Sequence, residues 1–141
     1  MRIVDVNVLV YAVNASDRHH GAAHRWLTKA LGGMESVGFP VVSLLGFVRL
    51  ITSPAIVRKP VSVERATSYV KDWMAQPPAR LVSAGPAHVE LLCRLLDEAG
   101  TAGNLVTDAH IAALALEQAA AVVTFDNDFR RFPGLPVETP D

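Results

Sequence analysis

The stretch that decides the fold is Arg2-Ile3-Val4-Asp5-Val6-Asn7-Val8-Leu9-Val10-Tyr11, which begins almost at the first residue. From the third to the tenth residue it is apolar except for Asp5 and Asn7. A short apolar run of this kind is typical of a central parallel strand that is covered on both faces. We expect the strand to end at Asp5, and open α/β sheets bind ligands at the carboxyl ends of their strands. A carboxylate in such an apolar setting is costly unless it is paired or binds a cation.

Length and composition indicate a single globular domain covering residues 1–141. Half of the chain is hydrophobic and 19% is charged, which excludes a disordered protein. Thirteen lysines and arginines stand against fourteen acidic residues, so overall charge gives no evidence for nucleic acid and only a local basic patch could. No signal peptide and no apolar run of ~18 residues is present. We therefore expect a cytoplasmic protein without a membrane span, with secretion of a fraction left open.

The rest of the chain alternates between predicted strands and helices. Strands are predicted at 36–42, 80–82, 121–125 and 137–138, and helices at 8–14, 19–31, 43–52, 62–76, 88–99 and 107–118. Pro40 favours a position toward the edge of the sheet for its strand. Cys93, the single cysteine, lies among leucines and is expected to be a small buried side chain. The alternation predicts a single three-layer α/β domain with a mainly parallel sheet of four or five strands.

Three aspartates interrupt apolar segments at the ends of predicted elements: Asp5, Asp108 and Asp126. Taken singly, Asp108 could cap its helix and Asp126 could be an ordinary turn residue. Taken together, they could converge with Asp128 at one edge of a parallel sheet. Clustered carboxylates raise one another's pKa unless a cation is present, and oxygen ligands suit Mg²⁺ or Mn²⁺. Such a site can support phosphodiester hydrolysis.

Three motifs together resemble the PIN-domain nucleases. They are Val4-Asp5-Val6-Asn7-Val8-Leu9, Thr107-Asp108-Ala109-His110-Ile111-Ala112-Ala113-Leu114-Ala115 and Val123-Thr124-Phe125-Asp126-Asn127-Asp128-Phe129. Within that family the chain is most similar to the VapC toxins of bacterial toxin–antitoxin pairs, over nearly its whole length. The resemblance implies a PIN-like fold and an endoribonuclease, dependent on Mg²⁺ or Mn²⁺, that cuts structured RNA such as tRNA or rRNA. It also implies a cognate VapB-like antitoxin that silences the enzyme, and it suggests a homodimer.

The resemblance assigns roles to individual residues of this chain. Asp5, Asp108 and Asp126 match the metal-binding carboxylates of the family, and Asp128 is a possible additional ligand. The polar positions expected to orient this cluster are matched by Asn7 and Thr124. Candidates for contacts with RNA phosphates are Arg49, Arg130 and Arg131.

The chain departs from the family at one position. PIN domains commonly carry a glutamate on the helix after the second strand, whereas the predicted helix at 43–52 has no acidic residue. Gly46 or Phe47 stands about where the glutamate would fall. Either Asp128 and water take its place or the metal binds more weakly.

Two other functions remain open from the sequence. The absent glutamate would suit a catalytically weak or inert PIN-like module that binds RNA or a protein partner. A haloacid-dehalogenase-like phosphatase would instead use Asp5 as a nucleophile that forms an aspartyl-phosphate. That family places a second aspartate two residues further on, where this chain has Asn7.

Overall fold

The computed structural model describes residues 1–141 and contains one five-stranded sheet in the order β3-β2-β1-β4-β5. All four strand pairings are parallel. The strands are β1 (Arg2–Val4), β2 (Val37–Pro40), β3 (Ala79–Val82), β4 (Ala121–Val123) and β5 (Val137–Glu138). The central position belongs to β1, where Ile3 and Val4 are completely buried. The prediction of a parallel α/β fold built around the first apolar run is confirmed.

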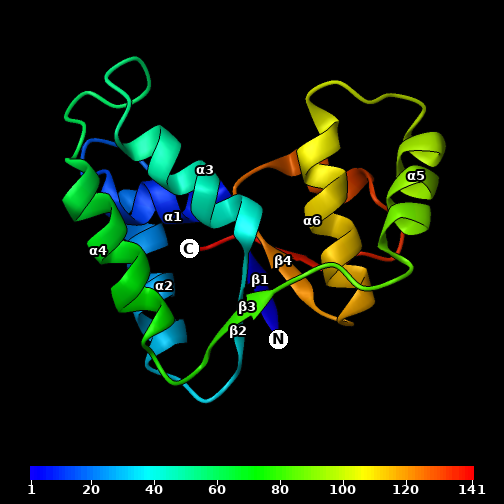
Figure 1. Cartoon of the computed structure of the whole chain (residues 1–141), viewed down its shortest axis with the longest axis horizontal. Helices are drawn as coiled ribbons and strands as arrows, with labels where there is room; N and C mark the ends of the chain where they lie inside the picture. Colours follow the sequence, from blue (N-terminus) through cyan, green and yellow to red (C-terminus); the bar gives the residue numbers. More distant parts are fainter.

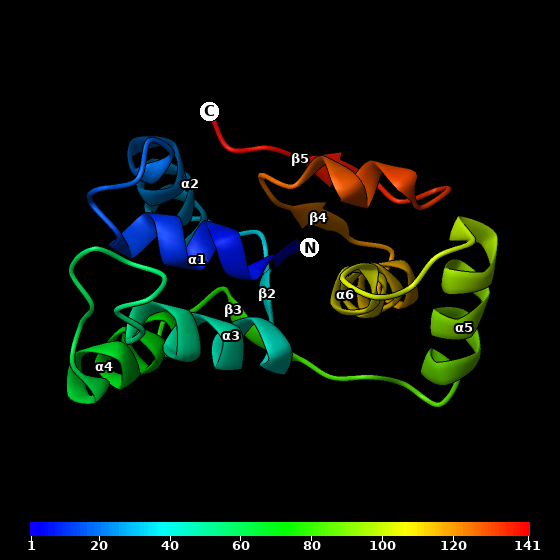
Figure 2. The same cartoon turned by 90° about the horizontal axis from the view of Figure 1, so that it is seen from above.

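Two groups of helices flank the sheet and make the expected three layers. The first group comprises α1 (Val6–Val13), α2 (His20–Leu31), α3 (Val41–Ile51) and α4 (Val63–Met74), and the second comprises α5 (His88–Ala99) and α6 (Leu105–Glu117). Figures 1 and 2 show the strands between these two groups. Each group covers its own hydrophobic core, of 17 and 14 buried residues respectively. No helix combines the length and the apolar character that crossing a membrane would require.

The first strand passes directly into the first helix at Asp5. This residue is the N-cap of α1, and its side chain accepts a hydrogen bond from the backbone N–H of Val6. An aspartate is a preferred N-cap because it satisfies a free N–H group at the start of the helix. The helix therefore begins at Val6, two residues before the predicted start at Val8. The strand end and the helix start occupy the same edge of the sheet.

Two sequence expectations about burial and position are wrong. Pro40 does not lie in an edge strand, because β2 is between β3 and β1. It is tolerated as the last residue of β2, where β1 no longer pairs: the β1 register ends at Gly38, while Pro40 pairs only with Val82 of β3. Cys93 is exposed rather than buried. It lies two residues before the buried Leu95, which is about 200° around α5, so it faces away from the core.

A chain of buried polar groups joins α5 to α6. Oε1 of Glu117 lies 2.6 Å from Nδ1 of His88, and Nε2 of His88 lies 2.8 Å from Nδ1 of His110. Oε2 of Glu117 accepts a hydrogen bond from the backbone N–H of Gly85, in the loop before α5. Burial lowers the pKa of His110, and the neighbouring His88 adds to this effect. These contacts hold α6 against α5 along its C-terminal half.

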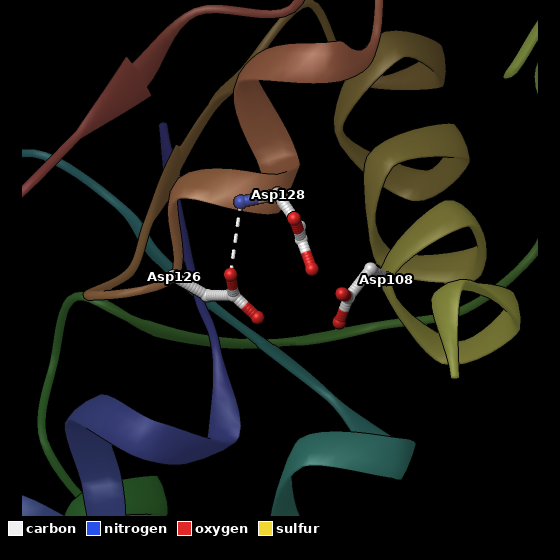
Figure 3. A group of neighbouring side chains, drawn as sticks. All are labelled: Asp108, Asp126 and Asp128. Carbon is white, nitrogen blue, oxygen red and sulfur yellow. Dashed lines mark hydrogen bonds between the residues drawn. The ribbon is translucent and has the colours of Figure 1, made fainter.

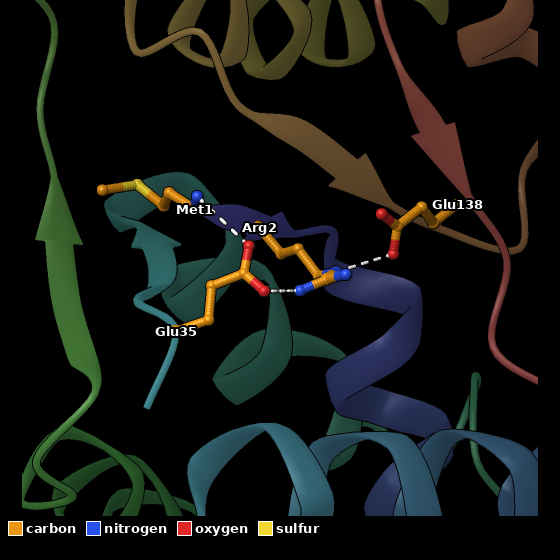
Figure 4. A network of polar contacts seen from close by, with 4 residues as sticks. All are labelled: Met1, Arg2, Glu35 and Glu138. Atoms are coloured by element: carbon orange, nitrogen blue, oxygen red, sulfur yellow. Dashed lines mark hydrogen bonds and ion pairs between the residues drawn. The ribbon is translucent and has the colours of Figure 1, made fainter. Parts of the chain in front are cut away.

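A second polar network closes the opposite end of the sheet, where the strands begin. Arg2 forms ion pairs with Glu35 and with Glu138, and its Nε lies 2.8 Å from Oε2 of Glu138 (Figure 4). The terminal amine of Met1 also approaches Glu35, at 3.4 Å. Ion pairs as exposed as these contribute little stability, about 0–1 kcal/mol each. Their importance is that they connect β1 to β5 and to Glu35, two residues before β2, at the edge remote from the aspartates.

Candidate metal centre

Three carboxylates gather at the carboxyl edge of the sheet. Asp108 comes from the first turns of α6, Asp126 follows β4, and Asp128 lies in the short 3₁₀ helix η1 (Asn127–Arg131). One oxygen atom of each lies within 4.8 Å of one oxygen of the others. Figure 3 shows the three side chains directed into a common space between α6 and η1. Asp108 and Asp126 are half-buried, whereas Asp128 is exposed.

Local structure explains why these carboxylates are held where they are. Asp126 is the N-cap of η1, and its Oδ1 accepts a hydrogen bond of 2.8 Å from the backbone N–H of Asp128 (Figure 3). The turn interpretation of Asp126 is therefore correct, and it is compatible with a role in binding. The capping interpretation of Asp108 is wrong, because α6 begins at Leu105 with Asn104 as its N-cap. Asp108 is the fourth residue of the helix, and its side chain is available for other contacts.

Asp5 lies beside this grouping and is not part of it. Its Oδ1 accepts the Val6 N–H at 2.7 Å, and its Oδ2 accepts the Thr124 hydroxyl at 2.7 Å. Only 3% of the residue is exposed. Burial raises the pKa of Asp5 to about 6; its two hydrogen bonds oppose this rise and the charge of Asp126 adds to it. The structure thus brings together Asp108, Asp126 and Asp128, while Asp5 acts on them from a shielded position.

The electrostatics of the cluster are unfavourable without a cation. The pKa of Asp108 is raised to about 7, chiefly by burial and then by the charges of Asp5, Asp126 and Asp128, in that order. No arginine, lysine or histidine forms an ion pair with any of the four carboxylates. A donor set made only of carboxylate oxygens suits hard divalent cations such as Mg²⁺ and Mn²⁺. The residues present therefore fit such an ion.

Thr124 is the hydrogen-bonding centre that connects the two sides of the site. Its buried hydroxyl donates to Asp5 and accepts from the backbone N–H of Asp126 at 2.9 Å and from Nδ2 of Asn7 at 3.1 Å. Asn7 also accepts a hydrogen bond from the backbone N–H of Phe125, at 3.2 Å. Through these contacts Asn7 and Thr124 join the start of α1 to the segment that follows β4. They give the two residues the means to orient the acidic side chains.

We expect Thr124→Val to destabilise the protein by about 2 kcal/mol, because a valine leaves buried donors of Asn7 and Asp126 without their acceptor. Urea unfolding measures the effect. Thr124→Ser is the matched control, because it retains the hydroxyl and should lose less stability than the valine variant. Equal stabilities of the two variants would contradict the assignment of the hydroxyl as the centre of the network.

A protein-family model places this geometry in a known context. The model described as the PIN domain matches residues 2–135. The chain belongs to the PIN-domain family. Among curated relatives of this PIN domain, Ribonuclease VapC37 of Mycobacterium tuberculosis is 48% identical over 140 residues, covering 99% of this chain and 97% of that protein. Ribonuclease VapC33 of the same species is 38% identical over 135 residues, covering 96% of this chain and 94% of that protein. Both identities place this PIN domain among the VapC ribonucleases.

Solved structures share the fold. VapBC2 from Rickettsia felis, bound to a promoter DNA fragment, matches this PIN domain with a TM-score of 0.73 and 20% identity, covering 99% of this chain and 98% of that one. VapC20 of Mycobacterium tuberculosis, described as a sarcin-ricin loop cleaving toxin, matches with a TM-score of 0.69 and 20% identity, covering 92% and 93%. At these identities the structures support the fold alone.

Close packing around Gly46 and Phe47 leaves no room for the glutamate that other PIN domains carry at about this position. A Cβ atom added at Gly46 would lie 2.9 Å from Cγ2 of Val6, which is closer than two carbon atoms normally approach. Phe47 is completely buried, with its ring centroid 4.7 Å from that of Trp73. A carboxylate at Gly46 would require α3 to shift against α1, and one at Phe47 would be buried against the aromatic residues of α4. The third clustered carboxylate comes from Asp128 instead.

The arginines proposed as RNA contacts are available for them. Arg49 lies on α3, and Arg130 and Arg131 are in η1 beside Asp128; all three are exposed and none forms an ion pair. Sequence reasoning missed two hydroxyl residues, Ser43 and Thr107, which line a cavity next to the carboxylates. The available signal was a serine within the otherwise apolar start of α3.

Proposed function

We propose that this PIN domain is a Mg²⁺- or Mn²⁺-dependent endoribonuclease that hydrolyses phosphodiester bonds in structured RNA, such as tRNA or rRNA. In this proposal it is the toxin of a toxin–antitoxin pair and is inhibited by a VapB-like antitoxin. The observation that carries the proposal is the group of three carboxylates with oxygen atoms within 4.8 Å of one another. The relatives named as VapC ribonucleases support the same activity.

Different residues of this chain would bind the cation, orient the site and bind the RNA phosphates. Asp108, Asp126 and Asp128 would hold the cation, and Asp5 would add negative charge from its buried position. The site is organised before substrate arrives, because two hydrogen bonds fix Asp126: its backbone N–H donates to the Thr124 hydroxyl, and its side chain accepts from the backbone N–H of Asp128. When bound, a divalent cation supplies a Lewis acid that lowers the pKa of water and stabilises the departing oxygen. Arg130 and Arg131 would bind phosphates on either side of the bond that is cut.

The phosphatase alternative loses its support in this geometry. A nucleophilic Asp5 would need a free oxygen atom directed at phosphorus. Both oxygens of Asp5 are engaged by hydrogen bonds, and the residue is 3% exposed. The alternative of an inert binding module has no specific contact in its favour. The three clustered carboxylates instead leave oxygen atoms free to bind a cation.

The metal requirement gives the direct test of the proposed activity. Purified protein incubated with tRNA and rRNA should produce defined fragments when Mg²⁺ or Mn²⁺ is present, and chelation by EDTA should lower the rate on the order of 10³-fold because water activation and charge neutralisation are both lost. Sequencing of the new RNA ends locates the cut. Restoration by added Mg²⁺ or Mn²⁺ is the control. Absence of cleavage with either metal, or cleavage that EDTA leaves unchanged, would refute the proposal.

The partners of the proposed toxin follow from its family. A VapB-like antitoxin should suppress cleavage when it is added before the RNA, at about one antitoxin per toxin. Homodimerisation also remains a prediction for this chain. Light scattering during size-exclusion chromatography, with and without the antitoxin, would measure both assemblies.

A further inference from the structure

A cavity of about 240 Å³ has two lining residues that are next in sequence to aspartates of the site. It lies between α3, the start of α1 and the first half of α6, and we call it the α3–α6 pocket; its lining includes Val6, Ser43, Arg49, Leu50, Thr107 and Ile111. Val6 directly follows Asp5, and Thr107 directly precedes Asp108. Figure 1 shows that α3 and α6 come from the two different helix groups. A substrate placed on the carboxylates therefore has this pocket immediately beside it.

The chemistry of the pocket is an apolar wall with a few polar groups. Val6, Leu45 and Leu50 supply apolar surface, and Ser43 and Thr107 supply hydroxyls. The hydroxyl of Ser43 is shielded from solvent and has no hydrogen-bond partner. Its place in the first turn of α3 explains this, because the residue four positions earlier is Phe39, which belongs to β2 and offers no helical carbonyl. Buried hydroxyls without a partner are rare in native proteins, so this one is free to bond with a polar group that enters the pocket.

The size of the pocket restricts the ligand. Pockets for drug-sized molecules begin at about 300 Å³, so this one suits a smaller planar group. Proteins that read single-stranded RNA bury unstacked bases and form hydrogen bonds with their edges. At the rim, Arg49 is exposed and has no acidic partner, which suits the phosphate attached to such a base.

We propose that the α3–α6 pocket holds one unstacked base of the RNA, next to the phosphate that is cut, and that it selects the sequence at that position. Thr107 forms a hydrogen bond with the edge of the base, and Ser43 forms a second one after its buried hydroxyl turns toward the pocket. Leu45 and Leu50 contact the faces of the base, and Arg49 binds the adjoining phosphate. This inference rests on the proposed ribonuclease function and deepens it. It makes Ser43 and Leu50 specificity-determining residues.

A base fits the pocket better than a segment of a protein partner. An apolar side chain from an antitoxin would match Val6 and Leu50 but would leave the Ser43 hydroxyl unpaired. A base has both an apolar face and a polar edge, so it can pack against the apolar residues and form hydrogen bonds with the hydroxyls at the same time. Arg49, a cation without a partner, adds charge complementarity to a phosphate.

The test uses a constant RNA hairpin with randomised positions around the cut, incubated with full-length protein and Mg²⁺ or Mn²⁺, followed by sequencing of the new ends. Wild type should prefer one or two bases at a single position beside the cut. Ser43→Ala should reduce that preference at least tenfold without lowering stability, because the hydroxyl it removes has no partner in the protein. Leu50→Phe fills the pocket and should reduce cleavage of the preferred sequence at least tenfold.

Val89→Phe is the matched control for Leu50→Phe, because it enlarges an exposed apolar residue on α5, away from the pocket. It should cut with wild-type preference. If Ser43→Ala and Leu50→Phe both keep the wild-type preference, the inference is overturned while the ribonuclease function stands. If they keep that preference but escape inhibition by the antitoxin, the pocket belongs to the protein partner and the inference is again overturned. Absence of cleavage by wild type would instead be the failure of the proposed function.

Discussion

Replacing Asp108 by asparagine is expected to lower the rate of RNA cleavage by about 10³-fold, which corresponds to roughly 4 kcal/mol of transition-state stabilisation. The same substitution should stabilise the metal-free protein. Burial and three neighbouring carboxylates raise the pKa of Asp108 to about 7, so its ionised form is disfavoured in the folded state. Asparagine keeps the shape of the side chain and carries no charge. At pH 8 we expect a gain of about 1 kcal/mol, after allowance for solvent screening at this half-buried position.

The combination of lost activity and gained stability distinguishes a ligand from a structural residue. Cleavage rates on a defined RNA and urea unfolding in the presence of EDTA measure the two effects. Asp72→Asn is the control, because Asp72 is an exposed carboxylate on α4, away from the cluster. It should change neither quantity. If Asp108→Asn retained full cleavage, or if it lost activity only because it unfolded, Asp108 would not be a metal ligand.

The metal-free protein is expected to become less stable as pH rises from about 4 to about 7. Both Asp5, with a pKa raised to about 6, and Asp108, with a pKa raised to about 7, ionise near 3.8 in the unfolded chain. Between these values the unfolded chain binds fewer protons than the folded one, so the free energy of unfolding falls with pH. The stability that these groups contribute is complete below pH 3.8 and is lost as pH passes 6 and then 7. The total loss should be on the order of 2–3 kcal/mol.

A divalent cation should reverse this loss. Because Mg²⁺ or Mn²⁺ binds the ionised carboxylates, it should stabilise the protein strongly at pH 8 and weakly at pH 5. Unfolding curves at a series of pH values, with EDTA or with added metal, measure the effect. His110, whose pKa is lowered, gives an opposite slope around its ordinary value of 6.5. The Asp108→Asn variant therefore serves as the reference, and a wild-type curve that matches its curve at every pH would count against the coupling.

Sequence patterns were sufficient for the framework of this protein. The apolar run around Val4 predicted the central strand, and the period of the later segments predicted most of the helices and the final strand at Val137. The residues of each helix or strand are consecutive, so their own pattern of apolar and polar side chains indicates the element. The position of β2 inside the sheet was not predictable from Pro40, because which strand edges are paired depends on partners distant in the sequence.

The candidate site was predictable in its residue types more than in its arrangement. The aspartates stood out because charges in apolar segments are unusual. That Asp5 is shielded and separate from the group around Asp108 depends on its hydrogen bonds to Val6 and Thr124 and on burial, which local sequence does not reveal. The α3–α6 pocket has no local signature. Its lining residues come from α1, α3 and α6, so only the folded chain brings them together.

The hydrogen bond between Thr124 and Asp5 also has a consequence for how the protein is made. It joins residues 119 positions apart in a chain of 141. A nascent chain that ends after α6 contains Asp108 but neither Asp126 nor Asp128, so it has one of the three clustered carboxylates. It also lacks β4, which pairs with the central strand β1. The acidic cluster can therefore assemble only after the segment that carries Asp126 and Asp128 has left the ribosome. Until then, Asp108 lacks the two carboxylates with which it is grouped in the folded chain.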